Sequence, residues 1–279
     1  QNTNIPLTPY AGISFYTKNE SNLISQANMA LHHAIKRSMP YHIHNEDDMD
    51  RTNYLENINT LSELNLALSE NRLVPYYQSI MNNKTEVKEK FESLLRIIST
   101  DGEPQLPGKY LRTASKTRLY PEITKQMIGK IFSQMSKCGE EFTINISAED
   151  IYNPEFFTFL ESMMNANPSC YNRVILEIIE SEDFESYRII SEFIKKSRKC
   201  GYRFAIDDFG SGYSNFSHLS RLNIDFIKFD GSLIRRIDQD RTSSVIIKHV
   251  TGLCRELNIR TIAEFVETES ILKIVRDFG

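Results

Sequence analysis

Two adjacent carboxylates, Asp207 and Asp208, lie in the stretch Phe204-Ala-Ile-Asp-Asp-Phe-Gly-Ser-Gly-Tyr213. The apolar residues before them predict a buried strand, and the two glycines after them predict a turn. Neighbouring side chains of a regular strand point to opposite faces, so both carboxylates can reach one site only where the strand breaks. Because paired carboxylates repel each other, a divalent cation bound through oxygen is the simplest partner. A solvated acidic turn is the alternative reading of this stretch alone.

Other apolar runs also carry acidic, amide or ammonium groups. They are Phe142–Ser147 with Asn145, Val174–Glu180 with Glu177 and Glu180, Phe226–Asp230 with Lys228 and Asp230, and Thr261–Glu267 with Glu264 and Glu267. Buried strands rarely hold charge unless it is paired or bound to metal. We therefore expect these groups to converge on one site.

The composition is that of a soluble globular protein, with 279 residues, 40% hydrophobic and 25% charged. The net charge of -4 disfavours binding of a nucleic-acid polymer through a basic surface. No apolar run is long enough to span a bilayer, so no membrane contact is expected from this fragment. The four cysteines are widely spaced, which indicates a reducing cytoplasm. The chain begins at Gln1 and reads as a fragment, so membrane anchoring elsewhere in the full-length protein stays open.

From Leu73 onward, strand-like and helix-like segments alternate, which predicts a parallel sheet covered by helices. The expected strands are 74–80, 88–94, 142–146, 174–178, 203–206, 226–229 and 261–263, and the clearest helices are 120–137, 186–200 and 241–257. The candidate residues follow strand ends, and no G-x-G-x-x-G follows the early strands. This pattern favours a β/α barrel over a doubly wound open sheet.

The first 72 residues read differently. Residues 1–46 predict a strand at 11–16, a helix at about 21–38 and a short strand at 41–44, too little for an independent core. An acidic break at 45–50 predicts a domain boundary, and apolar residues spaced by three or four over 55–68 predict an amphipathic linker helix. We therefore expect a small α/β remnant (1–46), a linker helix (47–72) and a barrel (73–279).

The segment Phe91-Glu-Ser-Leu-Leu-Arg96 resembles the signature of the EAL domain, the cyclic di-GMP phosphodiesterase family, with Ser93 in place of the usual alanine. Further motifs resemble that family in the right order: Asn145–Ser147, Glu177–Glu180, Asp207–Tyr213, Lys228–Asp230 and Ala263–Glu267. The resemblance covers Leu73 to Gly279. Residues 1–46 are similar to the C-terminal end of a GGDEF (diguanylate cyclase) domain without its cyclase signature.

The resemblance implies a modified (β/α)8, TIM-like barrel that hydrolyses cyclic di-GMP to linear pGpG with two Mg²⁺ or Mn²⁺ ions in bacterial signalling. It also implies a homodimer. By position, it implies metal ligation by Glu92, Asn145, Glu177, Asp207, Asp208 and Glu264, with Asp207 bridging the two ions. It implies catalytic roles for Glu264, Lys228, Asp208 and Glu180, the last bracing the Asp207–Tyr213 loop. It implies substrate-side roles for Arg96, Glu92, Asp230 and Glu267.

Three departures from the family pattern keep a second function open. Ile179 stands where threonine is usual, Phe265 stands where glycine is usual, and the family's eighth strand has no counterpart before Gly279. A catalytically weak or inactive cyclic di-GMP receptor is therefore the alternative. A Schiff-base role for Lys228 is also possible in a barrel, but the surrounding carboxylates would raise its pKa and oppose that role.

Overall fold

The computed structural model describes residues 9–15, 23–45, 50–115, 117, 119–179, 184–210 and 222–279. Residues 1–66 and 108–114 form one compact unit, and residues 67–107 and 115–279 form the other. The described residues contain no helix that is both long enough and apolar enough to cross a bilayer.

The first unit contains a two-stranded parallel sheet, β1 (Ala11–Ile13) and β2 (Tyr41–Ile43), connected through α1 (Leu23–Lys36). Helix α1 packs so closely on β1 that a Cβ at Gly12 would lie 2.0 Å from the Ala27 carbonyl oxygen. The predicted strand–helix–strand order is confirmed here with shorter elements. The unit also holds α3 (Gly108–Ala114) and most of α2 (Asp50–Ser69), the predicted linker helix.

The second unit is built on one sheet with the strand order β10-β9-β8-β7-β6-β4-β3, and β5 pairs with β4. Its strands are β3 (Leu73–Met81), β4 (Lys88–Ile98), β5 (Pro104–Gln105), β6 (Glu141–Ile146), β7 (Val174–Ile179), β8 (Tyr202–Phe209), β9 (Phe226–Phe229) and β10 (Arg260–Ala263). Strands β4 and β6 to β10 run parallel, whereas β3 and β5 run antiparallel to β4. The seven strands expected from the sequence all form, and β4 and β8 extend several residues beyond the predicted ends.

The sheet curls strongly. In the strand order, β4 and β9 are four steps apart, which is about 19 Å in a flat sheet at about 4.8 Å per step. Nevertheless Glu92 Oε1 on β4 lies 3.2 Å from Lys228 Nζ on β9. At the other end of the strands, Glu89 Oε2 on β4 lies 3.7 Å from Arg260 Nη1 on β10. Only a sheet rolled towards a barrel brings these side chains together, as the alternating pattern predicts.

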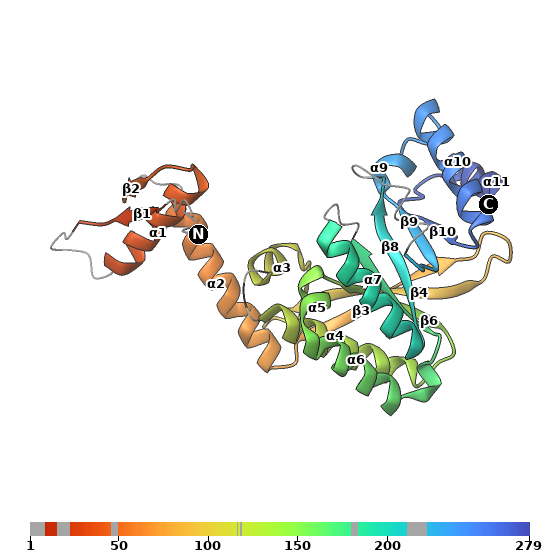
Figure 1. Cartoon of the computed structure of the whole chain (residues 1–279), viewed down its shortest axis with the longest axis horizontal. Helices are drawn as coiled ribbons and strands as arrows, with labels where there is room; N and C mark the ends of the chain where they lie inside the picture. Colours follow the sequence, from red (N-terminus) through yellow and green to blue (C-terminus); the bar gives the residue numbers. More distant parts are fainter. Residues whose placement is uncertain are drawn as a thin grey trace, which may run out of the picture. The chain divides into compact units, whose positions relative to one another are not determined.

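Helices follow most of the parallel strands (Figure 1). They are α4 (Leu119–Met135), α5 (Ala148–Tyr152), α6 (Pro154–Ala166), α7 (Phe184–Lys199), α9 (Gly231–Ile234), α10 (Arg241–Glu256) and α11 (Glu269–Phe278), with a 3-10 turn at Pro168–Cys170. Helix α4 contacts β3 and β6, α7 contacts β8, and α10 contacts β10. Asp240 begins α10 by accepting hydrogen bonds from the Thr242 and Ser243 amides.

The inner face of the curled sheet carries three levels of side chains, because every second residue of a strand faces the same side. At the amino ends of the strands lie Lys90, Glu141, Arg203 and Arg260; in the middle lie Ile175, Ala205, Phe226 and Ile262; at the carboxyl ends lie Glu177, Asp207, Lys228 and Glu264. The middle level packs as an apolar cluster. It separates two groups of charges that have different partners.

A cavity of about 890 Å³ lies beside β10, which pairs with β9 alone among the described residues. Its lining includes Lys90, Glu141, Phe226 and Arg260, which belong to the amino-end and middle levels. None of the carboxyl-end acidic residues lines it. The carboxyl-end acidic residues therefore lie outside this cavity.

Candidate functional site

A β-bulge brings Asp207 and Asp208 to one site. The register between β8 and β9 shifts between Ile206 and Phe209, so two residues of β8 oppose one of β9. Asp208 has a φ of 53°, in the left-handed region, and its N–H donates to Asp207 Oδ1 at 3.0 Å. As a result, ligand oxygens of Asp207, Asp208 and Glu264 all lie within 4.8 Å of one another. The predicted break in the strand is present, and it occurs inside β8, between Ile206 and Phe209.

Lys228 lies at the centre of the carboxyl-end level. Its Nζ is 2.8 Å from Glu264 Oε1, 3.0 Å from Glu177 Oε2, 3.0 Å from Asp207 Oδ1 and 3.2 Å from Glu92 Oε1. The Lys228 side chain is 1% exposed. Burial opposes its charged form, but the carboxylates of Glu177, Glu92 and Asp207 outweigh burial and raise its pKa. A permanently protonated amine is unsuited to Schiff-base chemistry.

The carboxylates outnumber the ammonium that they surround. Burial raises the pKa of Glu177 to about 8, with Lys228 opposing that shift and the charges of Glu92 and Asp207 adding to it. The Glu177 side chain is buried, and its Oε1 has no hydrogen-bond partner among the described residues. An unpartnered buried carboxylate oxygen beside further oxygen donors fits a hard divalent cation such as Mg²⁺.

Asp208 and Glu264 extend this cluster. Burial raises the pKa of both carboxyls; nearby Asp207 adds to each shift, and Lys228 opposes it. Asp230 lies close enough to Asp208 to contribute to its raised pKa. The pKa of Asp230 itself is lowered because its carboxylate accepts hydrogen bonds from Ser232 at the start of α9. Asp230 is thus an ionised helix cap beside the site.

The structure brings most of the predicted residues together. Glu92, Glu177, Asp207 and Glu264 contact Lys228, and Asp208 joins them through the bulge. Asn145 lies at the carboxyl end of β6, directly opposite Glu177 of β7 in the strand register.

The remaining predicted residues have other partners or lie outside the described residues. Arg96 lies four residues beyond Glu92, on the same face of β4 and closer to its carboxyl end, and its guanidinium lies 5.6 Å from the Tyr76 ring centroid. The Glu267 side chain is 62% exposed and lies 3.8 Å from Arg235 rather than in the carboxylate cluster. Glu180 and the loop beyond Gly210 lie outside the described residues, so its bracing role stays a prediction.

The sequence did not predict the contacts that hold Phe265 in place. Its φ is 52°, in the region that favours glycine, which explains why glycine is the usual residue at this position. The Phe265 ring contacts Gly231, where a Cβ would come within 2.2 Å of it, and the Arg235 guanidinium lies 3.9 Å from its centroid. Phe265 directly follows Glu264, so this contact helps to fix the chain at a candidate ligand.

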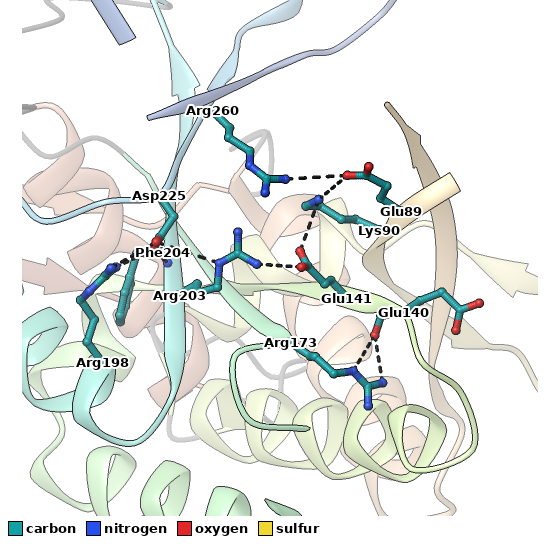
Figure 2. Close-up of polar contacts among 10 residues, drawn as sticks. All are labelled: Glu89, Lys90, Glu140, Glu141, Arg173, Arg198, Arg203, Phe204, Asp225 and Arg260. Carbon is teal, nitrogen blue, oxygen red and sulfur yellow. Dashed lines mark hydrogen bonds and ion pairs between the residues drawn. The ribbon is translucent and has the colours of Figure 1, made fainter. Parts of the chain in front are cut away.

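The charges at the amino ends of the strands were also missed. Lys90 lies 3.1 Å from Glu89 and 3.3 Å from Glu141, and Arg203 lies 2.8 Å from Glu141 (Figure 2). Arg198 and Asp225 form a further pair next to them. Here each of the three carboxylates has a cation within 4 Å, so the network carries no excess negative charge. Charged residues at the starts of otherwise apolar strands were the available signal.

Fold and site together define the class: a domain of the β/α-barrel type with an acidic, oxygen-rich centre at the carboxyl ends of its strands. The chain belongs to the EAL domain family, whose model matches residues 61–279. The barrel fold expected from the motifs is confirmed.

Two curated relatives carry related names. The chain is 27% identical over 268 residues to cyclic di-GMP phosphodiesterase PdeB of Shewanella oneidensis, covering 94% of this chain and 31% of PdeB. It is 31% identical over 234 residues to cyclic di-GMP phosphodiesterase PdeA of Borreliella burgdorferi, covering 82% of this chain and 35% of PdeA. The chain therefore spans about a third of the length of these relatives.

Solved structures agree on the fold. The EAL enzyme Bd1971, bound to cAMP and cyclic di-GMP, superposes with a TM-score of 0.76 at 22% identity, over 81% of this chain and 64% of Bd1971. The PaMucR phosphodiesterase in complex with cyclic di-GMP gives a TM-score of 0.69 at 25% identity, over 79% of this chain and 92% of PaMucR.

Proposed function

We propose that this chain is a catalytic domain that hydrolyses cyclic di-GMP to linear pGpG. The observation that carries the proposal is the convergence of Glu92, Glu177, Asp207 and Glu264 on Lys228, with Asp208 added by the bulge. The relatives named cyclic di-GMP phosphodiesterases and the PaMucR complex support the choice of substrate. The input that regulates the whole protein lies outside this proposal.

Two divalent ions, Mg²⁺ or Mn²⁺, complete the proposed centre. Glu92, Asn145, Glu177 and Asp207 would hold the first ion, and Asp207, Asp208 and Glu264 the second. The oxygen-only donor set and the unpartnered Glu177 Oε1 fit these hard cations. When bound, such ions supply an activated water and charge relief at phosphorus.

The side chains of the chain itself serve the remaining steps. The water oxygen forms a bond to phosphorus, the bond from phosphorus to O3′ breaks, and the proton released by water ends on the departing O3′. We assign to Glu264 the removal of the water proton, and its partly buried position beside Lys228 supports this role. The Lys228 ammonium offsets negative charge that develops on the phosphoryl oxygens. Arg96, near the carboxyl end of β4, is proposed to contact the nucleotide, and Asp230 to support Lys228.

A cyclic di-GMP receptor is the second candidate. The observation in its favour is Phe265, which holds a left-handed backbone conformation immediately after Glu264. A bulky residue at this position can displace the Glu264 carboxylate from the geometry that turnover needs without removing the binding surface.

Glu264→Gln separates the two functions. The amide keeps the shape but cannot accept a proton, so pGpG formation should fall on the order of 100-fold or more. Calorimetry should still show cyclic di-GMP binding. Glu256→Gln, an exposed position at the end of α10, is the matched control and should keep full turnover. If the unaltered whole protein binds cyclic di-GMP but makes no pGpG with Mg²⁺ or Mn²⁺, the receptor reading replaces the enzyme.

Two further proposals concern the setting of the reaction. The described cysteines Cys138, Cys170, Cys200 and Cys254 are free thiols, which supports a cytoplasmic location.

Homodimerisation stays a prediction from the resemblance, and analytical ultracentrifugation of the whole protein tests it.

A further inference from the structure

The ammonium of Lys228 occupies the point on which the candidate metal ligands converge. Glu92 Oε1, Glu177 Oε2, Asp207 Oδ1 and Glu264 Oε1 all lie between 2.8 and 3.2 Å from Nζ. These groups come from β4, β7, β8 and the end of β10, so the ammonium connects strands from both sides of the curled sheet. An ammonium has three protons and faces four acceptors here, which leaves the acceptors in excess.

A divalent ion needs the same oxygens. Mg²⁺ sits about 2.1 Å from its ligands. An ion bound to these oxygens would lie within about 5 Å of Nζ, because Nζ is itself about 3 Å from each of them, and two cations that close repel each other. Lysine and ion therefore cannot share the full set of oxygens. The flexible four-carbon stem of lysine allows Nζ to withdraw.

The other buried lysine of the inner face shows the contrast. Lys90 lies near two carboxylates, Glu89 and Glu141, and each has a second cation within 4 Å, Arg260 and Arg203 respectively. In this network three cations face two carboxylates, so it needs no further cation (Figure 2). Around Lys228, by contrast, the carboxyl groups of four residues face one ammonium.

We propose that Lys228 is an internal counter-cation that holds the ligand carboxylates in place in the metal-free domain and is displaced from them when divalent ions bind. Lys228 thus competes directly with metal, in addition to any role towards substrate. The inference rests on the proposed function only in taking these carboxylates as metal ligands. It makes Lys228 a positioning residue for the empty site.

Metal-free stability and metal affinity test this role without measuring turnover. In the whole protein, Lys228→Met should lower the melting temperature strongly in EDTA, and millimolar Mg²⁺ should restore most of the loss. Titration calorimetry should give an affinity for Mn²⁺ about tenfold or more tighter than in the parent, because no ammonium has to leave. Lys90→Met is the matched control: its melting loss should be the same with and without metal, and its Mn²⁺ affinity should be unchanged.

Equal melting losses for Lys228→Met in EDTA and Mg²⁺, or an unchanged Mn²⁺ affinity, would overturn the proposal. The Lys228→Met variant could fold only in the presence of Mn²⁺. In that case the proposal is supported if chelation unfolds the variant while the parent stays folded. Absence of Mn²⁺ binding in both proteins overturns it together with the metal part of the proposed function. If both proteins bind Mn²⁺ as expected but the parent makes no pGpG, only the proposed hydrolysis fails.

Discussion

Replacing Phe265 tests whether a strained backbone lies beside the site. A non-glycine residue in the left-handed region costs about 1–2 kcal/mol, and Phe265 has a φ of 52°. The Arg235 guanidinium over the Phe265 ring offsets about 0.5–1 kcal/mol of this strain. The contribution is modest because both side chains are about half exposed. Phe265→Gly relieves the backbone strain, which stabilises the fold, and loses the contact with Arg235, which destabilises it. Glycine also destabilises the fold by about 0.4–1 kcal/mol, because it raises the entropy of the unfolded chain. The three effects nearly cancel, so this variant should have close to parental stability.

Phe265→Ala is the informative comparison. Alanine also loses the ring contact with Arg235 but keeps the left-handed strain, so it should be about 1 kcal/mol less stable than Phe265→Gly. Urea unfolding followed by circular dichroism measures the difference as a shift of the midpoint at constant slope. An alanine variant as stable as the glycine variant would refute the reasoning, because the backbone at this position would then carry no strain.

A double-mutant cycle isolates the ring contact. Arg235→Ala should cost about 0.5–1 kcal/mol in the parent and almost nothing in the Phe265→Gly background. Equal losses in both backgrounds would show that Arg235 acts through other contacts, such as Glu267. Turnover of cyclic di-GMP by the same variants shows whether the strain limits Glu264. If the parent is silent, Phe265→Gly is the change expected to restore hydrolysis.

The remaining predictions concern charge and hydrogen bonding. Asp208→Asn removes one oxygen charge from the cluster and should lower turnover on the order of 100-fold with little loss of stability, measured as pGpG formation beside thermal melting. Arg173→Met should cost about 2–3 kcal/mol in urea unfolding, because its guanidinium donates to the carbonyls of four residues, whereas Arg188→Met on the surface should cost almost nothing. The metal-free fold keeps a proton on Glu177 up to a pKa of about 8, whereas the unfolded chain loses it near 4.5. Stability in EDTA should therefore fall as pH rises between these values, and a flat melting profile would contradict the assignment.

The barrel and its acidic residues were predictable because they break a simple physical rule. Charged residues such as Glu177 and Lys228 lie in otherwise apolar strands, and burying them alone would be costly. Parallel strands bring their carboxyl ends to the same edge, so alternation of strands and helices was sufficient to expect convergence. Boundaries were less accurate: β4 continues to Ile98, past the predicted end at Leu94, because it pairs there with β3 and β5.

The details that depend on backbone conformation were not predictable. The composition of Asp207-Asp208 indicates a break, but only pairing with β9 determines that the break is a bulge in which Asp208 adopts a positive φ. The partner of Phe265 was equally hidden, because Arg235 is thirty positions away in the sequence and meets the ring only after α9 has formed. The spacing of residues specifies which strands carry charge, whereas turns and bulges determine where each charge points.

The two charged levels inside the barrel show why the same residue types have different consequences. Lys90 and Lys228 are both buried lysines on the inner face, separated by the apolar cluster of Ile175, Ala205 and Phe226. At the amino ends, cations and carboxylates alternate, and each stabilises its neighbours. At the carboxyl ends, the carboxylates exceed the single ammonium, which is unfavourable for a closed core and favourable for a site that receives cations. The excess negative charge, rather than the presence of charge, therefore distinguishes the candidate site at the carboxyl ends of the strands from the ion-pair network at the amino ends.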